Sequence, residues 1–517
     1  MQFKRSISIA ALLFTAIGGI MGSGWLFGPM YVAKIAGPAA VLAWIVGAVL
    51  MTVIGFAFAE LAANSPVAGG MVQYAEKSHG PLMSFTVGWL VWVSSVVVAP
   101  IETLALLKYA ADYFPSLVHS IHGSTVLTRK GIFTAAFLMF FMVYINQFGA
   151  KLFSRLSTGF VVIKLAVPTL VLITLLYFHF NTANFHQYSG FMPYGWHGIL
   201  AALPLGGVVF SYIGNSPAIQ MAAEAQNPKV ALPIAILGSV FICAIVYVLL
   251  QIAFIGAINS EDVAQGWNHL NFGAETTGPF AAIANALGLA WLVVFIYIGA
   301  IVSPFGTAFI YTGATSRVNY ALSKIGFFPP FFSHLNKSGV PWRGLIFNYL
   351  VGLFLFMPFP TWQKMMGFIV SCFVISYSIG PLALIPLRKQ LTTKNAFELP
   401  YGKVFAITGF YICNLLVFWT GWSTVWRLMI TVLIGAVVFL YQLRTQKHLQ
   451  TKATKNTAKW LIPYFIGLTL ISYLGTFGGK NILGFGPDFV VILAFSIIIY
   501  VAAIRSAASN RITEPFR

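Results

Sequence analysis

The sequence predicts an all-α protein that crosses a membrane many times, and three observations lead to this fold class. The chain has 517 residues, of which 59% are hydrophobic and only 8% are charged. A soluble chain carries roughly a quarter charged residues, and a soluble core of this size could not enclose so much apolar surface. The apolar residues also form runs of about 20, the length that a helix needs to cross a bilayer.

About fourteen apolar runs have this length, and twelve spans are also possible because the C-terminal runs are less distinct. The run at 281–315 exceeds one span, so it is expected either to tilt or to continue into a helical loop. In chain order, the predicted spans cover residues 9–33, 39–62, 84–112, 131–147, 156–179, 198–221, 230–257, 281–315, 343–359, 363–386, 404–421, 425–443, 460–477 and 488–505.

Lysine and arginine predict the orientation of these spans. If the N-terminus lies inside, most basic residues fall in cytoplasmic loops, and the loop with Glu261 and Asp262 lies outside. This bias places both termini in the cytoplasm of a protein embedded in the inner or plasma membrane, in contact with lipid. The net charge of +19 therefore reflects topology and not a nucleic-acid partner.

Two spans contain an interruption rich in glycine or proline. The first is Gly18–Trp25 in the first span, and the second is Phe210–Pro217 in the sixth. In lipid, irregular backbone is tolerated only inside protein or beside a cavity. A pair of glycines such as Gly18 and Gly22 often serves helix packing alone, but two breaks in matching places of two halves indicate a transporter site.

The five-span spacing between the breaks predicts two inverted five-helix repeats in one transporter core. The repeats cover roughly residues 9–180 and 197–390 of a core at 1–390, and residues 391–517 add further transmembrane helices and a cytoplasmic tail.

Four motifs resemble the amino acid–polyamine–organocation permease superfamily over roughly residues 5–390. The pattern around Trp25, with the extra C-terminal hairpin, is most similar to the aspartate–proton symporter branch. In order, the motifs are Gly22-Ser23-Gly24, Pro66–Gly70 with Tyr74, Phe210–Gly214 with Glu224 and Asn227-Pro228, and Arg317 with Tyr320–Gly326 and Pro341.

This resemblance implies the leucine-transporter-type fold and secondary active transport of amino acids. It implies uptake or exchange of amino acids or related amines. The aspartate–proton symporter branch suggests proton-coupled symport of aspartate or glutamate, while Glu102 near the site leaves a neutral or cationic amino acid open. Glu224 is expected to be either a gate or a loop anchor. The family often has paired acids here, whereas Ala225 and Gln226 follow Glu224. The expected substrate-binding residues, including one acid from the third span, are Ile20, Gly22, Ser23, Gly24, Glu102, Phe210, Ser211, Tyr212 and Gly214.

Charges inside a span are costly and therefore mark functional candidates. Lys164 has no acid within a helical turn. In similar permeases the ammonium of a matching lysine resembles a replacement for a sodium ion, which implies bonds to carbonyls near Gly22 and to Ser303. The alternative is a structural lysine paired with a remote acid.

Glu102 could line the site, hold a substrate amine or carry the proton, or it could pair with Lys108. Trp89, Trp342 and Trp362 lie near span ends, as expected of an interface belt.

Other classes of membrane protein fit the sequence less well. A membrane enzyme needs convergent catalytic residues, and a channel needs a pore loop or a ring of like charges. The three cysteines lack metal or disulfide spacing, so neither a metal nor another cofactor is expected. An exchanger of amino acids or amines, or a sensor on the same fold, stays open, as does the oligomeric state.

Overall fold

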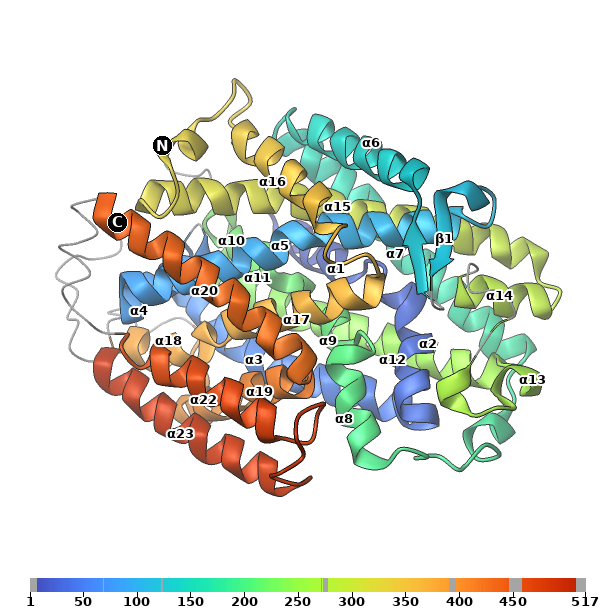
Figure 1. The fold of residues 1–517 in the computed structure, drawn as a ribbon. Helices are drawn as coiled ribbons and strands as arrows, with labels where there is room; N and C mark the ends of the chain where they lie inside the picture. Colours follow the sequence, from blue (N-terminus) through green and yellow to red (C-terminus); the bar gives the residue numbers. More distant parts are fainter. Residues whose placement is uncertain are drawn as a thin grey trace.

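The computed structural model describes residues 7–67, 69–121, 124–270, 272, 278–389, 397–445 and 458–507. Helices form one elongated bundle (Figure 1). The predicted all-α polytopic class is confirmed. Ala68, within the second motif, and the predicted boundary between residues 390 and 391 lie outside the described residues.

The first third of the chain supplies seven α-helices and three 3₁₀ turns. They are α1 (Ile9–Ile20), α2 (Gly24–Ala36), η1 (Gly37–Ala39), α3 (Ala40–Asn64), α4 (Gly70–His79), α5 (Pro81–Ala110), η2 (Pro115–Leu117), α6 (Arg129–Asn146), α7 (Ala150–Phe178) and η3 (Thr182–Phe185).

The middle of the chain is more fragmented, with several short helices and turns between the long ones. They are α8 (Gly195–Leu205), α9 (Val208–Tyr212), η4 (Ile213–Asn215), α10 (Ser216–Gln220), η5 (Ala222–Glu224), α11 (Pro228–Pro233), the π turn η6 (Ile234–Gly238), α12 (Ser239–Ala257), α13 (Ser260–Val263), η7 (Trp267–His269), α14 (Pro279–Ala286), α15 (Ala290–Ile325), η8 (Pro330–Ser333), α16 (Trp342–Leu355), α17 (Trp362–Tyr377) and α18 (Ile379–Arg388).

Four helices of the C-terminal part complete the bundle. They are α19 (Gly402–Trp419), α20 (Trp422–Thr445), α22 (Leu461–Leu474) and α23 (Pro487–Ala507). Asn414 of α19 ties two of them together, since it donates to the Ser496 hydroxyl at 2.8 Å and accepts from the Tyr464 hydroxyl at 2.9 Å.

A short β-hairpin interrupts the helical pattern between α5 and α6. Its strands, β1 (Val118–Ile121) and β2 (Ser124–Leu127), pair antiparallel with Val118 opposite Leu127. The sequence analysis predicted no strand there, because each strand has only four residues and lies in a loop.

Within the described residues, nine helical segments are long and apolar enough to cross a membrane, or ten with one bent pair. Each of the fourteen predicted ranges overlaps a helix. The range 281–315 is wrong at both ends, because Gly288 (φ +72°) separates α14 from α15 and α15 continues to Ile325. The 36 residues of α15 extend about 54 Å, well beyond a hydrocarbon core of about 30 Å.

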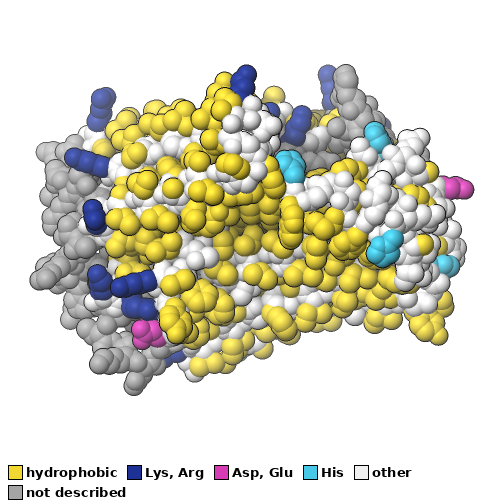
Figure 2. All heavy atoms as spheres, turned by 90° about the horizontal axis from the view of Figure 1, so that it is seen from below, with side chains coloured by type: hydrophobic (Ala, Val, Ile, Leu, Met, Phe, Trp, Pro, Cys, Tyr) yellow, Lys and Arg dark blue, Asp and Glu magenta, His cyan; other side chains and the backbone are white. Residues whose placement is uncertain are grey.

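The spans differ strongly in burial. The most apolar window is 89% buried in α5 and 100% buried in α17–α18, against 28% in α20 and 33% in α23. Figure 2 shows a broad hydrophobic band on one face and most of the visible Lys and Arg near one end. The central helices α5 and α17 therefore form the interior against which the functional site is built.

Candidate functional site

The first helix break lies where the sequence predicts it. Helix α1 ends at Ile20 and α2 begins at Gly24, so Met21–Ser23 leave the α-helical pattern. The Ile20 carbonyl accepts a hydrogen bond from the Tyr247 hydroxyl of α12 at 3.1 Å and one from the Gly22 N–H at 3.0 Å. Side chains of other spans thus satisfy backbone groups that an unbroken helix would pair internally.

The second break differs from the prediction. The α-helix stops at Leu205, bends by 49° across Gly206 and Gly207, and resumes as α9. Gly207 has φ +98°, in the left-handed region that favours glycine. The predicted break at Phe210–Gly214 is therefore wrong in part, because its first three residues are α-helical and only its end enters the 3₁₀ turn η4. The glycine pair after Pro204 was the available signal.

The two broken segments touch through their glycines. A Cβ atom on Gly19 would lie 2.2 Å from the Gly214 carbonyl oxygen, and one on Gly214 would lie 2.2 Å from the Gly19 carbonyl. One on Gly24 would lie 2.1 Å from the Ser211 hydroxyl oxygen. No side chain fits at such distances, so this contact requires glycine.

A small cavity of about 10 Å³ lies between the breaks. It holds about one water molecule, so this conformation is closed around the predicted binding site. Tyr212, the predicted tyrosine at the end of α9, does not line this cavity, since its hydroxyl donates to the Trp44 carbonyl of α3 at 3.3 Å. The cavity lining, which includes four predicted substrate residues, is Gly19, Ile20, Val98, Glu102, Phe210, Ile213, Gly214, Thr307, Tyr311 and Phe373.

Lys164 of α7 reaches the first break from one side. Its buried ammonium donates to the Gly18 carbonyl at 2.7 Å and to the Thr307 hydroxyl of α15 at 2.7 Å. The Thr307 hydroxyl in turn donates to the same carbonyl at 3.0 Å. The sequence analysis expected Gly22 and Ser303, so each actual partner lies one helical turn away. The Ser303 hydroxyl is buried without a hydrogen-bond partner.

Glu102 of α5 reaches the same break from the other side. Its Oε2 accepts from the Ser23 N–H at 2.8 Å, its side chain is buried, and the Ser23 hydroxyl also bonds to it. Glu102 and Lys164 interact electrostatically, but the described residues contain no ion pair between them, since the lysine ammonium bonds to the Gly18 carbonyl and Thr307. Lys108, the other partner considered for Glu102, places its ammonium 5.2 Å from the ring centre of Phe27.

Trp362 is a site residue that the sequence analysis placed wrongly at the membrane interface. It is only 3% exposed, and its indole N–H donates to the Ser23 hydroxyl at 2.9 Å. Its ring stacks on Tyr31 at 5.5 Å and meets Phe210 edge-on at 5.7 Å. A span-end tryptophan looks the same in sequence whether it faces lipid or a helix break, so no sequence signal distinguished the two.

The sequence profile described as amino acid permease matches residues 7–440. The chain belongs to the amino acid permease family. It is 35% identical to the glutamate/serine transporter AimA of Bacillus subtilis (strain 168), over 98% of this chain and 94% of the relative. It is 34% identical to the aspartate-proton symporter of the same organism, over 96% of each. The branched-chain amino acid permease BcaP of that organism shares 26% over 86% of this chain and 94% of its own.

In this amino acid permease, the predicted gate residue Glu224 ends the segment that follows the second break. Partial burial raises the pKa of its carboxyl, and the nearby Arg317 guanidinium opposes that rise. The backbone around it pairs with the N-terminal segment. Ile7 donates to the Glu224 carbonyl at 3.0 Å and accepts from the Gln226 N–H at 3.0 Å.

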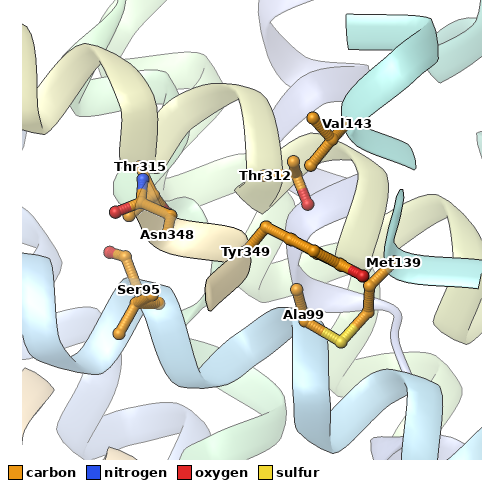
Figure 3. A pocket seen from close by; sticks show the side chains of 9 residues that line it. Ser95, Ala99, Met139, Val143, Thr312, Thr315, Asn348 and Tyr349 are labelled. Atoms are coloured by element: carbon orange, nitrogen blue, oxygen red, sulfur yellow. The ribbon is translucent and has the colours of Figure 1, made fainter. Parts of the chain in front are cut away.

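A second internal cavity of about 20 Å³ lies apart from the breaks, between α5, α6, α15 and α16 (Figure 3). Ser95 and Asn348 lie at one end of it, and Met139 and Tyr349 at the other. The Ser95 hydroxyl and the Asn348 amide nitrogen have no hydrogen-bond partner. The space is sufficient for one water, and its place among packed helices argues against a substrate site.

Proposed function

We propose that this amino acid permease is a proton-coupled symporter that imports amino acids by alternating access. Its core comprises two inverted five-helix repeats, and the amino acid binds between the two breaks. The contact of Lys164 with the Gly18 carbonyl and Thr307 carries this proposal. The buried Lys164 ammonium joins the end of α1 to α15. A change in its protonation would therefore change what holds α1 in place.

In this proposal the protein binds the α-carboxylate and the α-ammonium, which all amino acid substrates share. The positive end of the α2 dipole attracts the substrate carboxylate, and backbone carbonyls of the two breaks, near Ile20 and Ile213, hold its ammonium. Phe210 closes over the side chain. Serine, glutamate and aspartate are the first substrates to consider, because two relatives at 34–35% identity are described as a glutamate/serine transporter and an aspartate-proton symporter.

Alternating access then follows from differential affinity. The substrate enters from outside while Lys164 is in one protonation state, and closure buries both. A proton gained or lost at Lys164 favours the inward-open state, since a ligand shifts an equilibrium only by binding one state more tightly. Glu224 and Arg317 lie at the other end of the moving segment and act as its gate.

Both termini lie in the cytoplasm in this proposal. Most of the Lys and Arg visible in Figure 2 lie near one end of the molecule. Positive charge concentrates on the cytoplasmic side of membrane proteins.

Uptake into proteoliposomes tests the proposed function. We expect purified protein to accumulate radiolabelled L-serine, L-glutamate or L-aspartate when the outside is acidic, and a protonophore to abolish this accumulation. Uptake that requires amino acid inside and ignores the pH gradient would instead identify an exchanger. Binding of an amino acid without transport in either mode would identify a sensor.

A further inference from the structure

The N-terminus of α2 already binds a carboxylate, that of the protein's own Glu102. The Ser23 N–H at this helix end donates to Oε2 of Glu102 at 2.8 Å, and the Ser23 hydroxyl bonds to the same side chain. Helix α2 has 13 residues, so a substantial part of its dipole acts on this position. Glu102 thus occupies the place where the dipole would attract the carboxylate of an incoming amino acid.

The surroundings are shaped for a carboxylate at this point. A Cβ atom on Gly22 would lie 2.4 Å from Oε1 of Glu102, so the absence of a side chain there makes room for it. The Trp362 indole donates to the Ser23 hydroxyl at 2.9 Å and fixes that hydroxyl beside Glu102. The buried N–H and hydroxyl of Ser23 would each lose a hydrogen-bond partner if Glu102 moved away and nothing replaced it.

We propose that Glu102 is a resident substitute for the substrate carboxylate, and that an amino acid binds only after Glu102 has accepted a proton and released the Ser23 N–H. This inference rests on the proposed function, because it concerns the same site. Two carboxylates cannot share one half-helix end without strong repulsion. The amino acid carboxylate takes the N–H that the protonated Glu102 gives up.

The proton count follows from this exchange. One proton from outside converts the Glu102 carboxylate to a carboxylic acid as the amino acid binds. When the amino acid leaves on the inside, Glu102 loses that proton to the cytoplasm and returns to Ser23. Each amino acid is thereby imported with one proton, and the returning carboxylate displaces the bound amino acid.

Several titratable groups surround Glu102 and belong to this exchange. Lys164 from α7 attracts its charge, and the hydroxyls of Tyr247 from α12 and Tyr311 from α15 interact with it electrostatically. Phe210 from α9 and Phe373 from α17 face the same cavity without a titratable group. Lys164 therefore holds the counter-charge that keeps Glu102 ionised until the proton and the amino acid arrive. Glu102 thus carries the transported proton and the charge of Lys164 controls when Glu102 accepts it, which refines the proposed function.

Wild-type protein provides the first test, with L-serine and L-glutamate as probes. In weakly buffered solution with a pH indicator, we expect one proton to be taken up for each amino acid bound. The affinity falls about tenfold for each unit of pH above the range in which Glu102 titrates, because binding is linked to one proton. Binding without proton uptake would overturn the proposal, whatever the variants do.

Glu102→Gln provides the second test. The glutamine side chain has the size of the glutamate and an oxygen that can accept from the Ser23 N–H, but it carries no charge. We expect it to bind amino acids with an affinity that no longer varies with pH, to retain exchange, and to lose accumulation driven by a pH gradient. Ser95→Ala is the matched control, a buried change in the same helix away from the breaks, and it keeps the wild-type pH slope.

Two results for this variant contradict the proposal. One is a wild-type pH slope with normal accumulation, and the other is a folded protein that no longer binds any amino acid, which makes Glu102 a substrate ligand. A wild type that transports no amino acid in any mode would instead contradict the proposed function itself.

Discussion

The two helix breaks of this permease lie against each other but are held by different chemistry. At the first break, the charged side chains of Lys164 and Glu102 bond to the backbone at Gly18 and Ser23. At the second break, the neutral hydroxyl of Tyr377 donates to the Ile213 carbonyl at 2.6 Å. Among the described residues, charged side chains therefore bond to the backbone of the first break, whereas a neutral hydroxyl bonds to that of the second.

This difference assigns separate tasks to the two halves of the site. Tyr377 does not change charge near neutral pH, so the second break keeps its partner through the transport cycle. In the proposed cycle, the first break gains or loses hydrogen-bond partners as protons arrive. Coupling to the proton gradient is consequently expected in the first half, while the second half supplies a fixed surface.

Loss of the lysine charge tests this comparison most severely. In Lys164→Ala, Glu102 stays buried without its counter-charge, which costs about 3–5 kcal/mol. We expect accumulation driven by a pH gradient to disappear in proteoliposomes. Lys364→Ala, an exposed lysine at the start of α17, should transport normally. Full gradient-driven accumulation by Lys164→Ala or Lys164→Gln would remove the lysine from the coupling mechanism.

Gly19→Ala tests the contact between the breaks. A Cβ atom 2.2 Å from the Gly214 carbonyl oxygen forces the segments apart, at a cost of about 1–3 kcal/mol. We expect lower thermal stability and severely reduced transport. Gly159→Ala is the control, because no atom outside its own helix backbone lies within 4 Å of its added Cβ. Normal transport by Gly19→Ala would show that the breaks need not touch.

Thr307→Val distinguishes the observed lysine partner from the expected one. Loss of a hydrogen bond to a charged group costs about 1.5–3 kcal/mol, so we expect gradient-driven uptake to fall about 10- to 100-fold. Ser303→Ala should change uptake less than about twofold, because the Ser303 hydroxyl has no partner to lose. Equal effects of the two variants would contradict the geometry around Lys164.

Trp362→Phe gives the smallest expected effect. It keeps the aromatic contacts with Tyr31 and Phe210 but removes the hydrogen bond to Ser23, worth about 1 kcal/mol. We expect uptake kcat/KM to fall about fivefold. Trp342→Phe, at a tryptophan that is 37% exposed, should leave it unchanged. If both variants behave alike, Trp362 has no special role at the first break.

Sequence reasoning located the helices and the first break because both depend on local composition. Apolar runs define the spans, and the cluster Gly22-Ser23-Gly24 interrupts one of them so clearly that the observed break falls within a residue or two. Lys164 was recognisable for the same reason, as a charge surrounded by apolar neighbours.

The remaining features depend on contacts between distant residues. The choice of Thr307 over Ser303 follows from how α15 rotates against α7, and both residues fit the same sequence pattern. The bend at Gly206 and Gly207 had a local signal in the glycine pair after Pro204, but its close approach to the Trp362 ring, 3.1 Å from an added Cβ on Gly207, joins residues far apart in the chain. The pairing of Glu102 with Ser23 joins residues 79 positions apart.

The backbone pairing at Ile7 has a mechanical consequence for the transport cycle. Ile7 precedes α1, and Ala225 follows the second break, yet the two form a parallel bridge through two hydrogen bonds. Helix α1 cannot swing away by itself while this bridge lasts. Either both hydrogen bonds break when the cytoplasmic side of the transporter opens, or residues 222–226 move together with α1 as one rigid body.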